Sequence, residues 1–192
     1  MKQTLLYILV PAVVLATITA ACDGKFEPDP IDPRVPRYSE EPLNAAGALI
    51  NGEVWRAVLL GGFIAAPSDQ LLIEQDSDGI RLIIEGQSSD SSSMLAFYIN
   101  DPTGNFKNLS RLNGQKFVLD GTHKAVIGNS FFSLEDTLCS SSSGQLYIRS
   151  VKSIPQDDEN DYHLSGTFSF VIDQDACRRV EVTDGRFDYR VR

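Results

Sequence analysis

The chain has 192 residues and a net charge of −9, with 26 acidic against 17 basic side chains. Its length suits one domain that is large enough to bury a core. The negative charge repels phosphate groups, so we expect no nucleic-acid partner and no contact with anionic membrane surfaces except through a covalently attached lipid.

The first 21 residues have the layout of a secretory leader. Lys2 precedes an almost continuous apolar run that ends in small residues directly before Cys22. The run Ile18–Cys22 resembles the lipobox of bacterial lipoproteins. The resemblance implies cleavage before Cys22 and a lipid-modified, acylated Cys22 that anchors the protein in a membrane. An ordinary secreted chain with a structural cysteine and an uncleaved anchor helix are the alternatives.

Residues 22–44 form a predicted linker. Prolines alternate there with Asp, Glu and Arg, and this composition favours an extended, semi-rigid stalk that holds the domain off the membrane. The acidic residues Asp23, Glu27 and Asp29 are similar to the signal that sends some Bacteroidetes-type lipoproteins to the outer face of the outer membrane. We therefore expect a lipid-anchored protein of the cell outer membrane, on its periplasmic or its surface-exposed face.

Residues 45–192 show the alternation of β-strands and no sustained helical period. We expect about ten short strands in one all-β domain, an antiparallel sandwich or barrel, with the end of the chain at the centre of the sheet. The turn signals Asn51-Gly52, Asp76–Gly79 and Asp184-Gly185 predict hairpins. The predicted strands are Ala48–Ile50, Val54–Val58, Leu71–Gln75, Ile80–Glu85, Met94–Asn100, Lys116–Leu119, Ala125–Leu134, Gln145–Val151, Leu164–Ile172 and Arg179–Asp188 with its turn.

Cys139 and Cys177 lie at the outer ends of a predicted hairpin that turns at Asp158. Centring the turn there pairs Ile148 with Phe168, Leu146 with Phe170, and Cys139 with Cys177. In an oxidising compartment we expect a disulfide that closes a loop of 39 residues. It should contribute about 3 to 4 kcal/mol by chain entropy. Two unpaired thiols are the alternative, whereas the cysteine spacing disfavours a metal site.

The domain opens with Ala48–Ala57, which contains Asn51-Gly52 and Trp55, and it closes with Leu164–Phe170 and Val182–Asp188. These segments resemble the Asn-Gly-x-x-Trp strand pair and the Ser-Gly-Thr-Phe-Ser-Phe... Thr-x-Gly-x-Phe-Asp signature of a family of uncharacterised Bacteroidetes lipoproteins. The resemblance implies a β-rich domain at the cell envelope and no particular chemistry.

Patterns typical of chemistry are few, so we predict no catalytic residue, no metal and no cofactor. Five residues have the spacing of a calcium loop, but the segments beside them are predicted strands, and a hairpin turn is the preferred interpretation. The five residues are Glu74, Asp76, Asp78, Gly79 and Glu85. We interpret the acidic run Asp157–Asp161 as a solvated loop, and His123 and His163 as surface or loop histidines.

Trp55 and Tyr98 are weak candidates for ligand binding, because strand aromatics can stack against a sugar, with core packing as the alternative. We expect a non-catalytic, lipid-anchored cell-envelope protein that binds a small molecule, a glycan or a peptide. A structural or accessory subunit of an outer-membrane or surface complex, with an envelope protein as its partner, is the alternative. The absence of a catalytic motif disfavours an enzyme. Loops between Pro67 and Gly144 are expected to carry the function.

Overall fold

The computed structural model describes residues 34–41, 43–57, 71–89, 91–128, 139–154, 161–175 and 177–191. The leader, Cys22 and the linker up to residue 33 lie outside the described residues, as do the second half of the strand expected over Ala125–Leu134 and most of the acidic run. In the described part of the chain, no helix is long and apolar enough to cross a bilayer.

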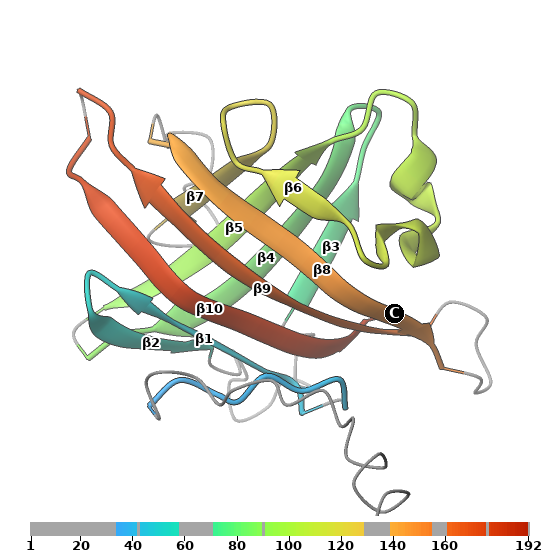
Figure 1. The fold of residues 1–192 in the computed structure, drawn as a ribbon, viewed down its shortest axis with the longest axis horizontal. Helices are drawn as coiled ribbons and strands as arrows, with labels where there is room; N and C mark the ends of the chain where they lie inside the picture. Colours follow the sequence, from blue (N-terminus) through green and yellow to red (C-terminus); the bar gives the residue numbers. More distant parts are fainter. Residues whose placement is uncertain are drawn as a thin grey trace, which may run out of the picture.

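Ten antiparallel strands form one sheet (Figure 1), which confirms the all-β class expected from the sequence. The strands are β1 (Ala45–Ile50), β2 (Glu53–Ala57), β3 (Leu71–Gln75), β4 (Gly79–Gln87), β5 (Ser92–Asn100), β6 (Lys116–Val118), β7 (Lys124–Gly128), β8 (Ser143–Ser153), β9 (Tyr162–Ile172) and β10 (Val180–Val191). Two short 3-10 helices, η1 (Asn105–Lys107) and η2 (Leu109–Leu112), lie between β5 and β6. The strand order is β6-β8-β9-β10-β1-β2-β4-β5-β7, and β3 pairs with β4 beside this path.

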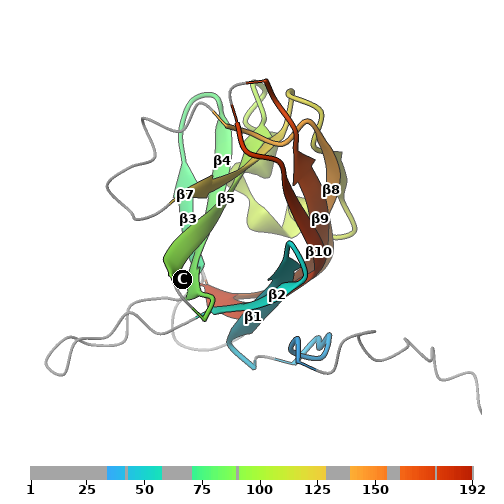
Figure 2. The same ribbon diagram turned by 90° about the vertical axis from the view of Figure 1, so that its left-hand side faces the viewer.

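The sheet curls round on itself into a half-barrel (Figure 2). The last two strands, β9 and β10, each have a partner on both sides, so the end of the chain lies inside the sheet, as expected. Just before β8, Ser140 forms an isolated bridge with Val126 of β7, and the Ser141 amide donates to the Ala125 carbonyl at 2.8 Å. The curl therefore brings β7 and the start of β8 into contact.

The core fills the inside of this curl, because every second side chain of each strand points inward. Phe97 of β5 packs on Phe168 and Phe170 of β9, with ring centroids 5.0 and 6.0 Å apart. Phe168 also stacks with Phe187 of β10 at 6.4 Å. Gly185 makes room for this cluster, since a Cβ there would lie 2.2 Å from Cδ2 of Phe168. Each buried aromatic contributes about 1.5 to 3 kcal/mol of burial free energy, so the cluster is a main source of stability.

Two predicted hairpins are confirmed. β1 and β2 meet across Asn51 and Gly52, whose φ angles of 51° and 80° are those of a type I′ turn. β3 and β4 meet across Asp76–Gly79, with Gln75 paired to Ile80. In both cases the residue types in the turn supply the backbone geometry that the hairpin needs.

The hairpin turn expected at Asp184-Gly185 is wrong. β10 continues through these residues to Val191, and its pairing with β9 shifts by one residue between Val182 and Gly185. Asp184 takes a φ of 52°, which an aspartate tolerates better than most residues. The pair is therefore a β-bulge, in which one extra residue bends the strand without ending it.

The register expected between β8 and β9 is also wrong, by two residues. Leu146 pairs with Phe168, and Ile148 pairs with Gly166. A second bulge lies between Ile148 and Ser150, and an inserted residue of this kind cannot be placed by counting back from a turn. The error of two keeps each side chain on its expected face, so Leu146 and Ile148 still point into the core.

The segment Arg34–Glu41 lies against the outer face of the sheet. Val35 is only 2% exposed, and Pro36 sits so close to Gly47 that a Cβ on that glycine would lie 2.5 Å from the proline Cδ. The Tyr38 hydroxyl lies 3.4 Å from the Ser165 hydroxyl of β9. The stalk expected over residues 22–44 therefore does not extend to residue 44, because its last residues pack as part of the domain.

Candidate functional site

A groove of about 630 Å³ lies on the outer face of β4, β5 and β7, near the end where the β3–β4 turn is found. Its size is within the range of small-molecule sites in proteins. Polar and charged side chains from three strands and two turns line it. Those used below are Asp76, Arg81, Tyr98, Asn100, Thr122 and Lys124.

Strand register explains how the groove acquires a row of three functional side chains. Tyr98 of β5 pairs with Arg81 of β4 on one side and with Lys124 of β7 on the other. Directly paired residues of neighbouring strands point to the same face, so the three side chains stand in one line across the sheet. Their neighbours Ile80, Ile99 and Ala125 point inward into the core. One phenol and two cations are thus presented together on the outer face.

The electrostatics of this row are set by Arg81. Its guanidinium lies 5.2 Å from the Tyr98 ring centroid, a cation–π contact, and Nη1 is 2.9 Å from Oε2 of Glu74. The Nε of Arg81 is buried without a hydrogen-bond partner among the described residues. Burial raises the pKa of the Tyr98 hydroxyl, and the Arg81 charge opposes part of that rise. Tyr98 is therefore a neutral hydrogen-bonding group at neutral pH, and it lies beside the charged guanidinium of Arg81.

The turn at one end of the groove uses its acidic residues for its own structure. Oδ1 of Asp76 accepts hydrogen bonds from the amides of Asp78 and Gly79, each at 2.8 Å. Glu74, the first residue of the calcium-loop spacing, pairs with Arg81 across the strands. Among the described residues, no three His, Cys, Asp or Glu side chains come together as metal ligands. The pattern that resembled a calcium loop is a hairpin, as preferred from the sequence.

Trp55, the other aromatic considered for ligand binding, lies inside the core with 0% exposure. Its indole nitrogen donates to the Ser93 hydroxyl at 3.0 Å. The ring fills the space over Gly86, where a Cβ would lie 2.3 Å from Cζ2 of the indole. This position gives Trp55 a packing role and keeps it away from the groove that contains Tyr98.

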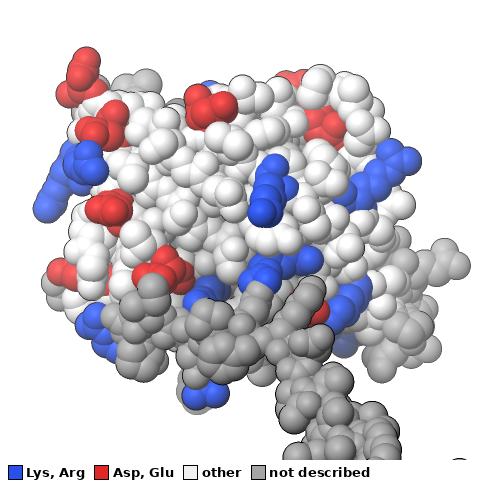
Figure 3. Space-filling view, in the orientation of Figure 1, with Lys and Arg blue, Asp and Glu red and all other residues white. Residues whose placement is uncertain are grey.

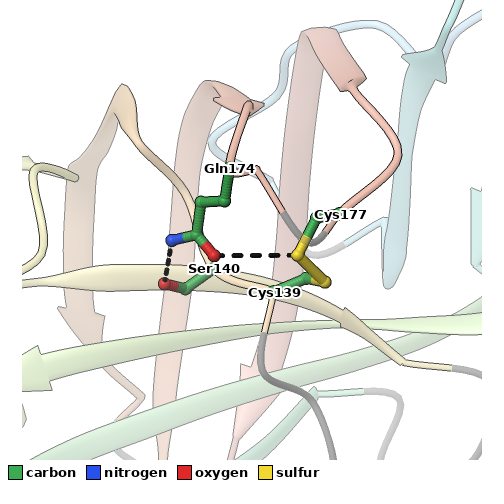
Figure 4. The surroundings of a disulfide bond; sticks show 4 residues. All are labelled: Cys139, Ser140, Gln174 and Cys177. Atoms are coloured by element: carbon green, nitrogen blue, oxygen red, sulfur yellow. Dashed lines mark hydrogen bonds between the residues drawn. A yellow bond between two sulfur atoms is a disulfide. The ribbon is translucent and has the colours of Figure 1, made fainter.

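The predicted disulfide between Cys139 and Cys177 is confirmed, with a Cα–Cα distance of 5.8 Å. Figure 4 shows it between the segment before β8 and the loop after β9, with Gln174 beside it. The side chain of Gln174 donates from Nε2 to the Ser140 hydroxyl at 3.3 Å, and the backbone carbonyl of Gln174 accepts the Cys177 amide at 2.8 Å. The cysteines are not opposite each other in the β8–β9 ladder, because the chain leaves that ladder at Ser143 to bridge to β7.

A buried polar cluster on the outer face of β9 and β10 was not expected. Nε2 of His163 and Oδ1 of Asp188 are 2.5 Å apart, and both side chains are about 95% buried. Burial raises the pKa of Asp188, while the hydrogen bond with His163 opposes the rise. The expectation that His163 is a surface or loop histidine is therefore wrong. His123 lies in the loop before β7, where its Nδ1 accepts the Asn100 amide at 3.1 Å.

This cluster has the residue types of a hydrolytic site but not the arrangement. The Ser165 hydroxyl is within hydrogen-bond distance of Tyr38, not of His163. The covering segment and the paired Arg190 and Asp161 enclose the cluster. The segment Arg34–Glu41 lies beside this cluster and contacts the sheet through Tyr38 with Ser165 and Glu40 with Lys152. No sequence pattern could have revealed it, because the covering segment looks like linker.

Comparison of the chain with protein-family models, with curated proteins and with solved structures found no match.

Proposed function

We propose that the protein is a non-catalytic, lipid-anchored component of the cell envelope whose β-domain binds a small molecule, a glycan or a peptide in the groove over β4, β5 and β7. The observation that supports it is the row of Arg81, Tyr98 and Lys124 along a groove of about 630 Å³. Small-molecule sites are concave and use a small number of precisely placed polar groups to orient the ligand, and this row would supply such groups.

The chemistry of the lining defines the ligand class. Arg81, Lys124 and the Tyr98 hydroxyl offer donors, and Asn100 and Thr122 at the other end offer acceptors as well. A ligand with several hydroxyl, amide or carboxylate groups would satisfy both ends.

Amide chemical shifts of the isotope-labelled mature protein test this proposal. The probes are glucose oligosaccharides, galacturonate oligosaccharides and an alanine tripeptide. We expect one of the three to shift the amides of Arg81, Tyr98, Asn100 and Lys124 together, because these residues line one groove.

Substitution separates a groove ligand from unspecific binding. Lys124→Ala and Tyr98→Ala should each weaken the binding at least about tenfold, the effect of losing one well-placed hydrogen bond to a charged or partly buried group. Arg178→Ala, an exposed side chain in the β9–β10 loop, is the matched control and should leave the binding unchanged. Shifts that survive Lys124→Ala, or no groove shift with any probe, would overturn the proposal.

A further inference from the structure

Positive charge is concentrated on one face of this acidic protein, the outer face of β6, β8, β9 and β10. Figure 3 shows Lys and Arg over the centre and lower part of this face, with most of its Asp and Glu toward the left and upper edges. Strand register places four basic side chains there, and the contact with the Tyr38 ring places a fifth, Arg149; we call the five the basic face. They are Lys116, Arg149, Lys152, Arg186 and Arg190.

Several contacts hold the side chains of the basic face in fixed positions. Lys116 lies over the Tyr147 ring at 4.8 Å, and Arg149 lies over the Tyr38 ring at 4.5 Å. Lys152 pairs with Glu40, and Arg190 pairs with Asp161, so part of the charge is balanced locally. Arg34, Arg37 and Arg56, on the packed segment and on the neighbouring β2, add three cations beside the face. Glu181 and Asp188 of β10 also stand on this outer face, because their neighbours Val182 and Phe187 are in the core. With Glu40 and Asp161 they offset part of the positive charge, so the positive excess of the face depends on the three added arginines.

The segment that leads toward Cys22 crosses the same side of the molecule. Arg34–Glu41 packs on β9, β10 and β1, where Tyr38 contacts Ser165 and Pro36 contacts Gly47. The 12 residues from Cys22 to Pro33 can span at most about 40 Å when fully extended. A lipid on Cys22 would therefore keep this side of the molecule within about 40 Å of the bilayer surface.

We propose that the basic face docks on a membrane surface that carries anionic lipid headgroups, and that it orients the domain with the groove turned away from the bilayer. Tyrosines such as Tyr147 have the amphipathic character found at membrane interfaces. Basic side chains near an anionic leaflet each add to the affinity, and the attraction acts within a Debye length. The orientation depends on the anchor proposed above, whereas the affinity of the face for anionic headgroups does not.

Vesicle co-sedimentation of the mature chain, residues 22–192 with Cys22→Ala, measures this affinity without an acyl chain. The strands of the described residues lie between Ala45 and Val191, so removing the leader leaves the described fold complete. We expect binding to phosphatidylcholine vesicles that contain about 30% phosphatidylglycerol, and loss of that binding at about 0.5 M NaCl. Pure phosphatidylcholine vesicles should not sediment the protein.

Two double variants assign the binding to the face. Lys116→Gln with Arg186→Gln should weaken vesicle binding about thirtyfold. Lys107→Gln with Arg178→Gln removes the same charge at exposed positions in η1 and the β9–β10 loop, and it should change the affinity little. The salt dependence of the unsubstituted chain provides the second test if the first double variant does not fold.

Three results would overturn the proposal. The first is equal binding to neutral and anionic vesicles, and the second is equal loss in both double variants. The third is binding to soluble polygalacturonate without binding to anionic vesicles, which would assign the face to an acidic polysaccharide. None of these results bears on the groove, whose ligand is measured with Lys124→Ala.

Discussion

Asp101, which follows directly after β5, shows how one carboxylate shapes a loop. Its Oδ2 accepts the Phe106 amide at 2.7 Å, and its Oδ1 accepts the Thr103 hydroxyl at 2.9 Å. These bonds favour the charged carboxylate, and the Phe106 amide is the largest cause of a pKa held below the ordinary value of 3.8. The bonds fix the start of η1, which brings Leu112 of η2 into the core.

The direction of this pKa shift predicts an acid-sensitive part of the stability. Because the folded-state pKa is lowered, the contribution of Asp101 is fully present above pH 3.8 and is lost as the pH falls through the folded-state value. We therefore expect Asp101→Asn to lower the free energy of unfolding at pH 7 and to change it less in strong acid. Urea titrations of both proteins at several pH values measure this, with Asp175→Asn in the exposed β9–β10 loop as the control. A difference that stays constant with pH would contradict the assignment.

At the scale of elements, bulges and the disulfide determine how the strands meet. The bulges in β8 and β10 each insert a residue into the ladders on either side of β9, which increases the local twist and helps the sheet to curl. The disulfide then joins the segment before β8 to the loop after β9. Neither cysteine lies in a strand, so the disulfide joins two segments that the strand ladders do not pair.

Removing the disulfide should destabilise the domain without unfolding it. The cysteines are 38 positions apart in the sequence, and a loop of that length corresponds to about 3 to 4 kcal/mol of chain entropy. We expect Cys139→Ala with Cys177→Ala to lower the free energy of unfolding by about that amount. Denaturant titrations of the oxidised protein and the double variant provide the measurement. An unchanged midpoint and slope would show that the bond contributes nothing to stability.

For the whole molecule, the central prediction concerns the anchor. If Cys22 carries a lipid, Cys22→Ala should move the protein from the membrane fraction to the soluble fraction of cells, since the basic face alone gives only a salt-sensitive attachment. The double variant Cys139→Ala with Cys177→Ala is the matched control and should stay in the membrane fraction. Salt-resistant membrane association of Cys22→Ala would reject the lipid anchor.

Two parts of the outer face differ in whether a small ligand can reach them. His163 and Asp188 are buried beside the packed segment Arg34–Glu41, so that part of the sheet is closed to small ligands. The groove containing Tyr98 lies across the curled sheet on β4, β5 and β7. In the proposed arrangement, one face holds the membrane and the other holds the ligand.

Local residue patterns were enough to predict the all-β class, most strand positions, and the turns at Asn51-Gly52 and Asp76–Gly79. The Cys139–Cys177 pair was predicted correctly, but from a strand register that is wrong by two residues. Alternation and turn chemistry depend on neighbours in the sequence, and they are therefore readable from it. The bulges at Asp184 and beside Arg149 were not readable, because an inserted residue leaves the alternation almost intact and changes only which partner it meets.

Tertiary structure alone decided which aromatic and which charges face outward. Trp55 and Tyr98 have similar strand contexts, yet one is enclosed in the core and the other lines a groove, because the curl of the sheet gives each strand an inner and an outer side. The total charge of −9 indicated a surface repelled by anions, but the folded sheet brings five cations to one face. A sum over the sequence carries no information about direction, and only the folded sheet assigns each charge to a side.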